Sequence, residues 1–162
     1  MTEQTTTKRE RWLALLFIAI SLLVISLDNT ILNVALPSIS RELGASSSDL
    51  QWIVDAYVLV FAALLLTTGA IGDRIGRKRA LQFGLAWFGV GSLAAGLSTT
   101  TEMLILSRAF LGVGGAIIMP ATLSIVTATF RDPKERSQAI GIWAAVFGLG
   151  VGLGPVAGGL LL

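Results

Sequence analysis

Cysteine and histidine are both absent from this chain of 162 residues, and only 14% of its residues are charged. Their absence excludes disulfides, thiol nucleophiles, histidine bases and the usual zinc or haem ligands. The sequence also shows no nucleophile–base pair and no phosphate-binding loop. We therefore expect no catalytic site, no bound metal and no cofactor.

The low charge content indicates a membrane protein. A soluble domain carries about 25% charged residues, whereas this chain is 54% hydrophobic. The hydrocarbon core of a bilayer is about 30 Å thick and needs about 20 mostly apolar residues as a helix. The predicted fold class is therefore all-α integral membrane. We expect an N-terminal tail and five transmembrane helices, at residues 1–11 and at 12–36, 50–71, 80–97, 103–130 and 138–162.

A cleaved signal peptide is the alternative interpretation of the first apolar stretch. Basic residues precede it, as they do in a signal peptide. However, the stretch exceeds the length of about 7–15 residues that is usual for the core of a signal peptide, and no A-x-A cleavage site follows. The sequence therefore favours a membrane span.

Lysine and arginine are distributed unevenly around the expected helices. Two of the four connections hold only Arg41 between them. The tail and the other two connections hold Lys8, Arg9, Arg11, Arg74, Arg77, Lys78, Arg79, Arg131, Lys134 and Arg136. By the positive-inside rule the N-terminus is cytoplasmic. The apolar spans predict a multi-pass protein of a cell membrane, most simply the bacterial cytoplasmic membrane. The basic clusters between them are short and form no continuous stripe, so we expect no nucleic-acid partner.

The fifth apolar stretch runs to the last residue, Leu162, without a polar tail. Because membrane proteins rarely end inside the hydrocarbon, we expect the chain to be the N-terminal part of a longer protein. Many transporters contain two inverted repeats of three helices each, and the five helices expected here fall one short of such a pair.

Three ionisable residues, Asp28, Asp55 and Arg108, fall within expected spans. Each costs about 2.5–3.5 kcal/mol at the centre of a helix on insertion scales. At a rise of about 1.5 Å per residue they lie in the outer half of three different helices, where we expect them to meet around one polar cavity. A carboxylate that changes its burial or its cationic neighbour takes up or releases a proton. The alternative is an ion pair that only fixes packing, and a shallow Asp55 can also reach interfacial water.

Prolines and glycines interrupt the expected helices. We expect Pro37 to end the first helix and Pro120 to kink or break the fourth. Gly112, Gly114 and Gly115 give the fourth helix a smooth face, which serves either close packing or a hinge.

The connection between the second and third helices has an ordered pattern, Gly69-Ala-Ile-Gly72-Asp73-Arg74-Ile-Gly76-Arg77-Lys78-Arg79. It resembles the loop signature of the major facilitator superfamily of transporters, G-x-x-x-D-r-x-G-r-k-x. The resemblance implies that this connection is a cytoplasmic gate, in which the aspartate and arginine form charged contacts that latch the two halves of the transporter. The gate residues would be Gly69, Gly72, Asp73, Arg74, Gly76, Arg77 and Lys78.

Two further segments agree with that family. The run Leu27-Asp28-Asn29-Thr30-Ile31-Leu32-Asn33-Val34-Ala35-Leu36-Pro37 resembles a signature of the fourteen-helix branch of drug:proton antiporters. The run Arg108-Ala-Phe-Leu-Gly112-Val-Gly-Gly115-Ala116 is similar to a family motif whose buried arginine is assigned to proton transfer. The resemblance implies that Asp28 and Arg108 couple transport to protons. It further implies that Asp55 binds substrate, because some members that export cationic drugs carry an aspartate there.

The fifth helix fits the antiporter motif G-x8-G-x3-G-P-x2-G-G at Gly141, Gly150, Gly154, Pro155, Gly158 and Gly159. Three of these glycines are four residues apart on one face, which permits close approach of another helix, and the proline should bend the helix. Ordinary small-residue packing explains the glycines but not this spacing with Gly-Pro. In the family the motif marks exporters that exchange with protons and is generally missing from symporters.

The resemblance therefore implies a proton-coupled antiporter that exports small amphipathic drugs or metabolites, with cationic compounds as candidates. Its expected partners are the small-molecule substrate, protons, the lipid bilayer and the C-terminal half of the transporter. A substrate:proton symporter and a non-transporting membrane subunit with the same fold are the alternatives.

Overall fold

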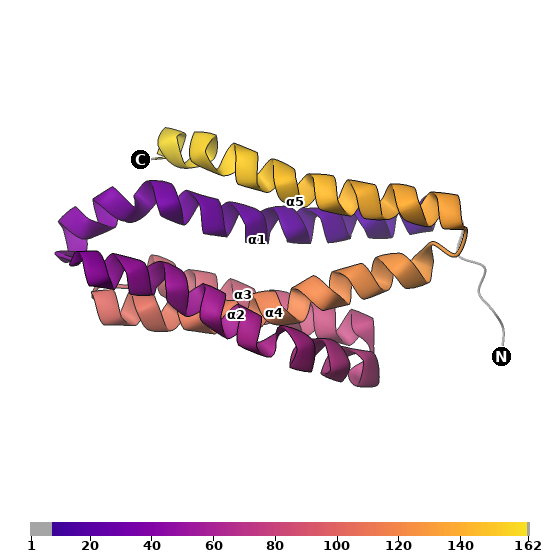
Figure 1. The fold of residues 1–162 in the computed structure, drawn as a ribbon, viewed down its shortest axis with the longest axis horizontal. Coiled ribbons are helices and arrows are strands. Elements are labelled where there is room, and N and C mark those ends of the chain that lie inside the picture. The colour runs from indigo at the N-terminus through magenta and orange to yellow at the C-terminus, as the bar shows by residue number, and fades with distance from the viewer. Residues whose placement is uncertain (1–7, 162) are drawn as a thin grey trace.

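The computed structural model describes the backbone of residues 8–161, which forms five helices joined by short connections (Figure 1). They are α1 (Lys8–Leu43), α2 (Ser47–Ile75), α3 (Arg77–Gly96), α4 (Thr101–Thr129) and α5 (Pro133–Leu161). Four of them, all except α3, are long and apolar enough to cross a membrane. The all-α prediction is confirmed, and α3 is the least apolar span because its first turn holds Arg77, Lys78 and Arg79.

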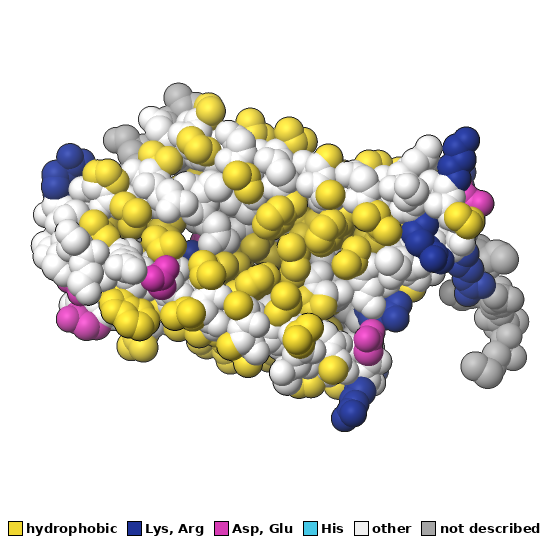
Figure 2. Space-filling view, viewed as in Figure 1, with side chains coloured by type: hydrophobic (Ala, Val, Ile, Leu, Met, Phe, Trp, Pro, Cys, Tyr) yellow, Lys and Arg dark blue, Asp and Glu magenta, His cyan; other side chains and the backbone are white. Residues whose placement is uncertain are grey.

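The helices form two layers (Figure 1). In one layer α1 packs along α5; in the other α4 lies between α2 and α3 and packs along both. Apolar side chains fill the bundle at two places, one around Leu22, Val126 and Phe130 and the other around Leu111 and Ile118. Figure 2 shows apolar side chains across the middle of the face in view and charged ones towards its ends, as a bilayer requires.

Capping residues explain why most helices begin earlier than their apolar runs. In α2, the Ser46 hydroxyl accepts a hydrogen bond from the Asp49 amide, and the Ser46 amide donates to the Asp49 carboxylate at 2.9 Å. This reciprocal capping box fixes the start of α2. In α5, Pro133 occupies the first turn, where its missing N–H costs nothing. The helix therefore starts before the predicted residue 138.

Pro37 does not end α1, contrary to the sequence prediction. The helix continues through Pro37 to Leu43 and ends at Gly44, whose φ of 65° is left-handed. A proline removes one intrahelical hydrogen bond, and a helix in a membrane protein tolerates that loss where its surroundings compensate. The left-handed glycine is the actual terminator.

Pro120 lies inside α4, which stays continuous and bends along its length (Figure 1). Because proline has no N–H, the carbonyl of Ala116 loses its intrahelical donor. The Thr68 hydroxyl on α2 donates a hydrogen bond to that carbonyl at 2.6 Å. Gly69 beside it leaves room for the proline ring, since a Cβ there would lie 3.4 Å from the Cβ of Pro120. The bend in α4 is thus stabilised from α2.

Replacing Thr68 with valine should lower the free energy of unfolding in detergent by about 1 kcal/mol, because the Ala116 carbonyl then has no donor. The matched control is Thr67→Val, since the Thr67 side chain is exposed and the structure gives it no hydrogen bond to a described residue. Chemical denaturation of both variants measures the difference. Equal stabilities of the two variants would contradict the assigned role of Thr68.

Candidate functional site

Arg108 is buried in the middle of the bundle, where 2% of its surface is exposed. Its Nη1 forms an ion pair with the Asp28 carboxylate at 2.6 Å. Its Nη2 donates to the Asn29 side-chain oxygen at 3.2 Å, and its Nε donates to the Ile53 carbonyl at 3.3 Å. Each guanidinium nitrogen therefore has an acceptor, and the acceptors come from α1 and α2 while the arginine belongs to α4.

Tyr57 on α2 completes the surroundings of Arg108. Its ring centroid lies 4.7 Å from the guanidinium carbon, which is the geometry of a cation–π contact. Glycines on α4 make this approach possible. A Cβ at Gly115 would lie 2.5 Å from the Tyr57 hydroxyl oxygen, and one at Gly112 would lie 2.7 Å from the Tyr57 carbonyl oxygen. The sequence left open whether these glycines serve close packing or a hinge, and the structure shows close packing.

Asp28 also faces a cavity of about 540 Å³ between α1, α3 and the start of α4. Its side chain is 20% exposed, whereas that of Arg108 is 3% exposed. Ser92, Ser98 and Glu42 add polar groups to the otherwise apolar wall. The carboxylate is therefore the member of the ion pair that water or a proton can reach.

Asp55 does not join Asp28 and Arg108, so only two of the three intramembrane charges meet. It is half-buried, does not line the cavity beside Asp28, and makes no ion pair or hydrogen bond with a described residue. Helix periodicity gives the reason. Ile53 and Tyr57 are buried on the side of α2 that packs along α4. Asp55 is two residues from each of them, and at about 100° per residue it points to the opposite side of α2. Its role in substrate binding stays a prediction.

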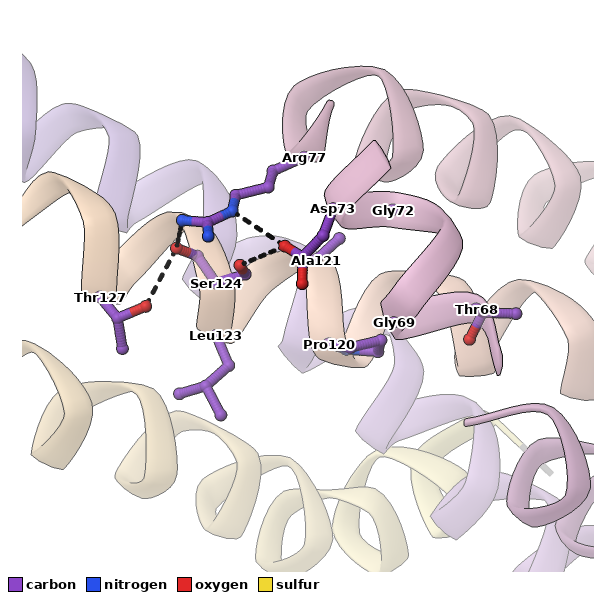
Figure 3. A pocket seen from close by; sticks show the side chains of 10 residues that line it. All are labelled: Thr68, Gly69, Gly72, Asp73, Arg77, Pro120, Ala121, Leu123, Ser124 and Thr127. Atoms are coloured by element: carbon purple, nitrogen blue, oxygen red, sulfur yellow. Dashed lines mark hydrogen bonds and ion pairs between the residues drawn. The ribbon is translucent and has the colours of Figure 1, made fainter. Parts of the chain in front are cut away.

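Four of the predicted gate residues, Gly69, Gly72, Asp73 and Arg77, line a cavity where α2, α3 and α4 meet (Figure 3). Arg77 donates from Nε to Asp73 at 3.2 Å and from Nη1 to the Ser124 carbonyl at 2.9 Å. The Ser124 hydroxyl donates to the same Asp73 oxygen at 3.3 Å. Gly76, with φ of 100°, is the single residue between α2 and α3. These bonds connect three helices of this chain; a latch to another half stays a prediction.

The remaining gate residues divide into packed and exposed ones. Gly69 and Gly72 line a cavity of about 310 Å³ beside Asp73 and Arg77, and a Cβ at Gly72 would lie 3.4 Å from the Cβ of Ala80. Arg74 and Lys78 are exposed. The side chains of Asp73 and Arg77 are themselves 61% and 42% exposed, so their ion pair contributes little to stability and is open to other contacts.

The glycines of the fifth-helix motif face two directions. A Cβ at Gly150 would lie 2.5 Å from the Ser26 Cβ, one at Gly154 would overlap Thr30, and one at Gly158 would lie 3.0 Å from the Val34 Cβ. Each of these glycines therefore faces a residue of α1, and those α1 residues are also four apart. A Cβ at Gly141 or Gly159 would meet nothing within 4 Å, and Pro155 is exposed.

Two hydroxyl groups of α1 hydrogen-bond to the backbone of α5 across this contact. The Ser26 hydroxyl donates to the Phe147 carbonyl at 2.8 Å, and the Thr30 hydroxyl lies 3.3 Å from the Gly150 carbonyl. Asn29 lies between these two residues and holds Arg108. The motif on α5 thus positions the segment of α1 that carries the Asp28 ion pair.

Substituting valine for Gly154 should force α1 and α5 apart, because the new side chain overlaps Thr30. We expect the free energy of unfolding in detergent to fall by about 1–3 kcal/mol. Gly152→Val is the matched control: it changes the same helix, but a Cβ there meets nothing within 4 Å, so its effect should stay within about 0.5 kcal/mol. Thermal unfolding compares the two, and an equal loss in both would disprove the interface.

Three relatives cover nearly all of this chain. The methyl viologen resistance protein SmvA of Salmonella typhimurium is 47% identical over 152 residues, which are 94% of this chain and 31% of the relative. The multidrug efflux pump LfrA of Mycolicibacterium smegmatis is 46% identical over 158 residues, 98% and 31% of the two chains. The puromycin resistance protein pur8 of Streptomyces alboniger is 42% identical over 151 residues, 93% and 30%.

The chain spans about a third of the length of these relatives. Together with the four membrane-length helices, they confirm a multi-pass protein of the cell membrane. Residues 18–162 match the profile of the Major Facilitator Superfamily. The family predicted from the four motifs is therefore correct, and the chain belongs to the Major Facilitator Superfamily.

Proposed function

We propose that this chain is part of a proton-coupled antiporter of the fourteen-helix type that exports small amphipathic molecules, cationic ones among them. The observation that carries the proposal is the buried Asp28–Arg108 ion pair beside a cavity, inside helices of membrane length. Relatives named for multidrug efflux and for resistance to methyl viologen and puromycin support the direction of transport.

Asp28 carries the transported proton in this proposal. When a proton binds its carboxylate oxygen, the ion pair with Arg108 is lost and the guanidinium keeps a positive charge. Asn29, the Ile53 carbonyl and the Tyr57 ring still hold it. Because α1 and α4 belong to different layers, loss of the ion pair removes the charged contact between the layers and leaves the hydrogen bond from Arg108 to Asn29. Proton release restores the pair and the contact.

Asp55 supplies a negative charge for a cationic substrate. It is half-buried, and no described residue pairs with it, so a positive ligand meets a carboxylate that is not already neutralised. Asp73 at the opposite end of α2 and Arg77 at the start of α3 act as the gate, and α5 acts through its contact with α1. Each of these roles is separable from the proton role of Asp28 by substitution.

Proton-driven efflux of a fluorescent cationic dye tests the proposal. The full-length protein that contains this sequence is placed in inverted membrane vesicles, and dye movement is followed after an acid interior is imposed. We expect the wild type to transport dye and Asp28→Asn to lose the response to the gradient. Glu102→Gln is the matched control, because it removes an exposed carboxylate from the first turn of α4 and should transport normally.

The outcomes separate the alternatives. If Asp28→Asn transports as well as the wild type, the assignment of the proton to Asp28 is wrong. If the wild type moves dye only along with protons, the protein is a symporter. If it moves no dye under any gradient, the substrate class is wrong, and a metabolite exporter or a non-transporting subunit takes its place.

A further inference from the structure

Arg108 bonds to α1 through two consecutive residues. Its Nη1 pairs with the Asp28 carboxylate at 2.6 Å, and its Nη2 donates to the Asn29 side-chain oxygen at 3.2 Å. A carboxylate loses its charge when it binds a proton, whereas an amide oxygen accepts a hydrogen bond whatever the pH. Among the described residues of α1, these are the two that bond to Arg108. Asn29 is therefore the link between α1 and Arg108 that a proton does not alter.

The side chain of Asn29 is held in the orientation that this link requires. Its Nδ2 donates to the Ile25 carbonyl one turn earlier at 3.0 Å, which directs the amide oxygen towards the guanidinium. Ser26 and Thr30, on either side of it, bond through their hydroxyls to the backbone of α5. Contacts with a neighbouring helix thus hold the segment of α1 that carries Asn29 in place.

The cost of losing acceptors falls on Arg108, because its side chain is only 3% exposed and an arginine stays charged in proteins. The Ile53 carbonyl and the Tyr57 ring contact it from α2. When Asp28 is protonated, Asn29 is the side chain of α1 that still offers a lone pair without a competing O–H. Without Asn29, neither terminal nitrogen of the guanidinium would have such an acceptor on α1, and buried charged donors are costly to leave unpaired.

We propose that Asn29 is the positioning residue of the proton site, which keeps the guanidinium of Arg108 bound to α1 while Asp28 carries the proton. The inference rests on the proposed function, because that function assigns the proton to Asp28. When the carboxylate binds a proton, Nη1 loses its charged partner and Nη2 keeps the amide oxygen. When the proton leaves, the carboxylate recaptures a guanidinium that has stayed beside it. Asn29 therefore governs how readily the carboxylate exchanges its proton, without binding the proton itself.

Few other ionisable groups face this site. The cavity beside Asp28 is lined by Arg108 from α4 and by Glu42 from α1, and Glu42 lies 14 residues further along the helix, about 21 Å away. A second cavity of about 270 Å³, lined by Asn29, adds the Tyr57 phenol from α2. Among the residues that the structure describes, α3 and α5 contribute no ionisable side chain to the wall of either cavity. A changed pH response in an Asn29 variant therefore reports on the ion pair.

Thermal unfolding of the purified full-length protein tests the link without transport. Asp28→Leu and Asn29→Leu each remove one acceptor and keep a branched side chain. We expect each to lower the Tm by a few degrees, and the double variant to lower it by clearly more than the sum, because only the double variant leaves both terminal nitrogens of Arg108 unpaired on α1. Adding Arg108→Met to the double variant should recover most of that loss, since the unpaired charge is gone.

Asn33→Leu is the matched control. The Asn33 amide also donates to the carbonyl four residues earlier, at 3.1 Å, but it is exposed and has no bond to Arg108. Combined with Asp28→Leu, it should give additive losses of Tm.

The pH dependence of dye transport in inverted vesicles separates positioning from packing. Asn29→Leu should move the interior pH that gives half-maximal transport about one unit towards acid, because the protonated site loses an acceptor that it depends on. Asn29→Asp should move it towards alkaline pH, because two carboxylates beside one guanidinium repel each other and one of them binds a proton more readily. Asn33→Leu should keep the wild-type midpoint. A side chain that only fills space would slow transport without moving the midpoint in opposite directions.

Two results overturn the inference: additive losses of Tm in the double variant of Asp28 and Asn29, or a wild-type midpoint in both Asn29→Leu and Asn29→Asp. The proposed function fails separately. If the wild type exports dye and Asp28→Asn loses the response to the gradient, but the losses of Tm are additive, only the role of Asn29 is wrong. If the losses exceed their sum and nothing is exported under any gradient, Asn29 does hold Arg108 and the antiporter proposal is wrong.

Discussion

A positive charge that cannot reach water organises this bundle. Arg108 is buried among apolar helices, where an uncompensated charge is costly. Compensation has to come from elsewhere in the chain, and it comes from an acid and an amide on α1 and from backbone and an aromatic ring on α2. The need to surround one guanidinium therefore fixes the relative positions of three helices. It also requires small residues on α4, because a larger side chain would keep the ring of Tyr57 away.

Both layers are held by the same kind of contact. Lipid offers no hydrophobic gain for helix association, so membrane helices rely on close packing and on hydrogen bonds between them. Glycines of α4 admit α2, and glycines of α5 admit α1. In each contact a hydroxyl bonds to a backbone carbonyl of the partner helix, from Thr68 in one layer and from Ser26 in the other. Arg108 on α4 joins the two layers, because it contacts Asp28 and Asn29 on α1.

The sequence predicts the helices and the family of this protein better than it predicts helix ends and individual contacts. Apolar runs, buried charges and motif order were enough for the helices, for the family and for the meeting of Asp28 with Arg108. Helix ends were missed because capping is a local signal that hydropathy ignores, although Ser46 followed by Asp49 could have been read as a capping box. The position of Asp55 was missed because the face that α2 buries depends on its partner helix. Asn29 and Tyr57 carry no signal until α1, α2 and α4 are placed together.

Gly76 alone connects α2 to α3. One residue separates the two helices, and its backbone is left-handed, so the pair turns back on itself within a single peptide unit. A tilt of α2 therefore displaces the start of α3 more directly than it would across a longer connection. The other three connections, at residues 44–46, 97–100 and 130–132, hold three or four residues each. The α2–α3 corner is therefore the tightest connection of the described chain, and it joins two helices that both pack along α4.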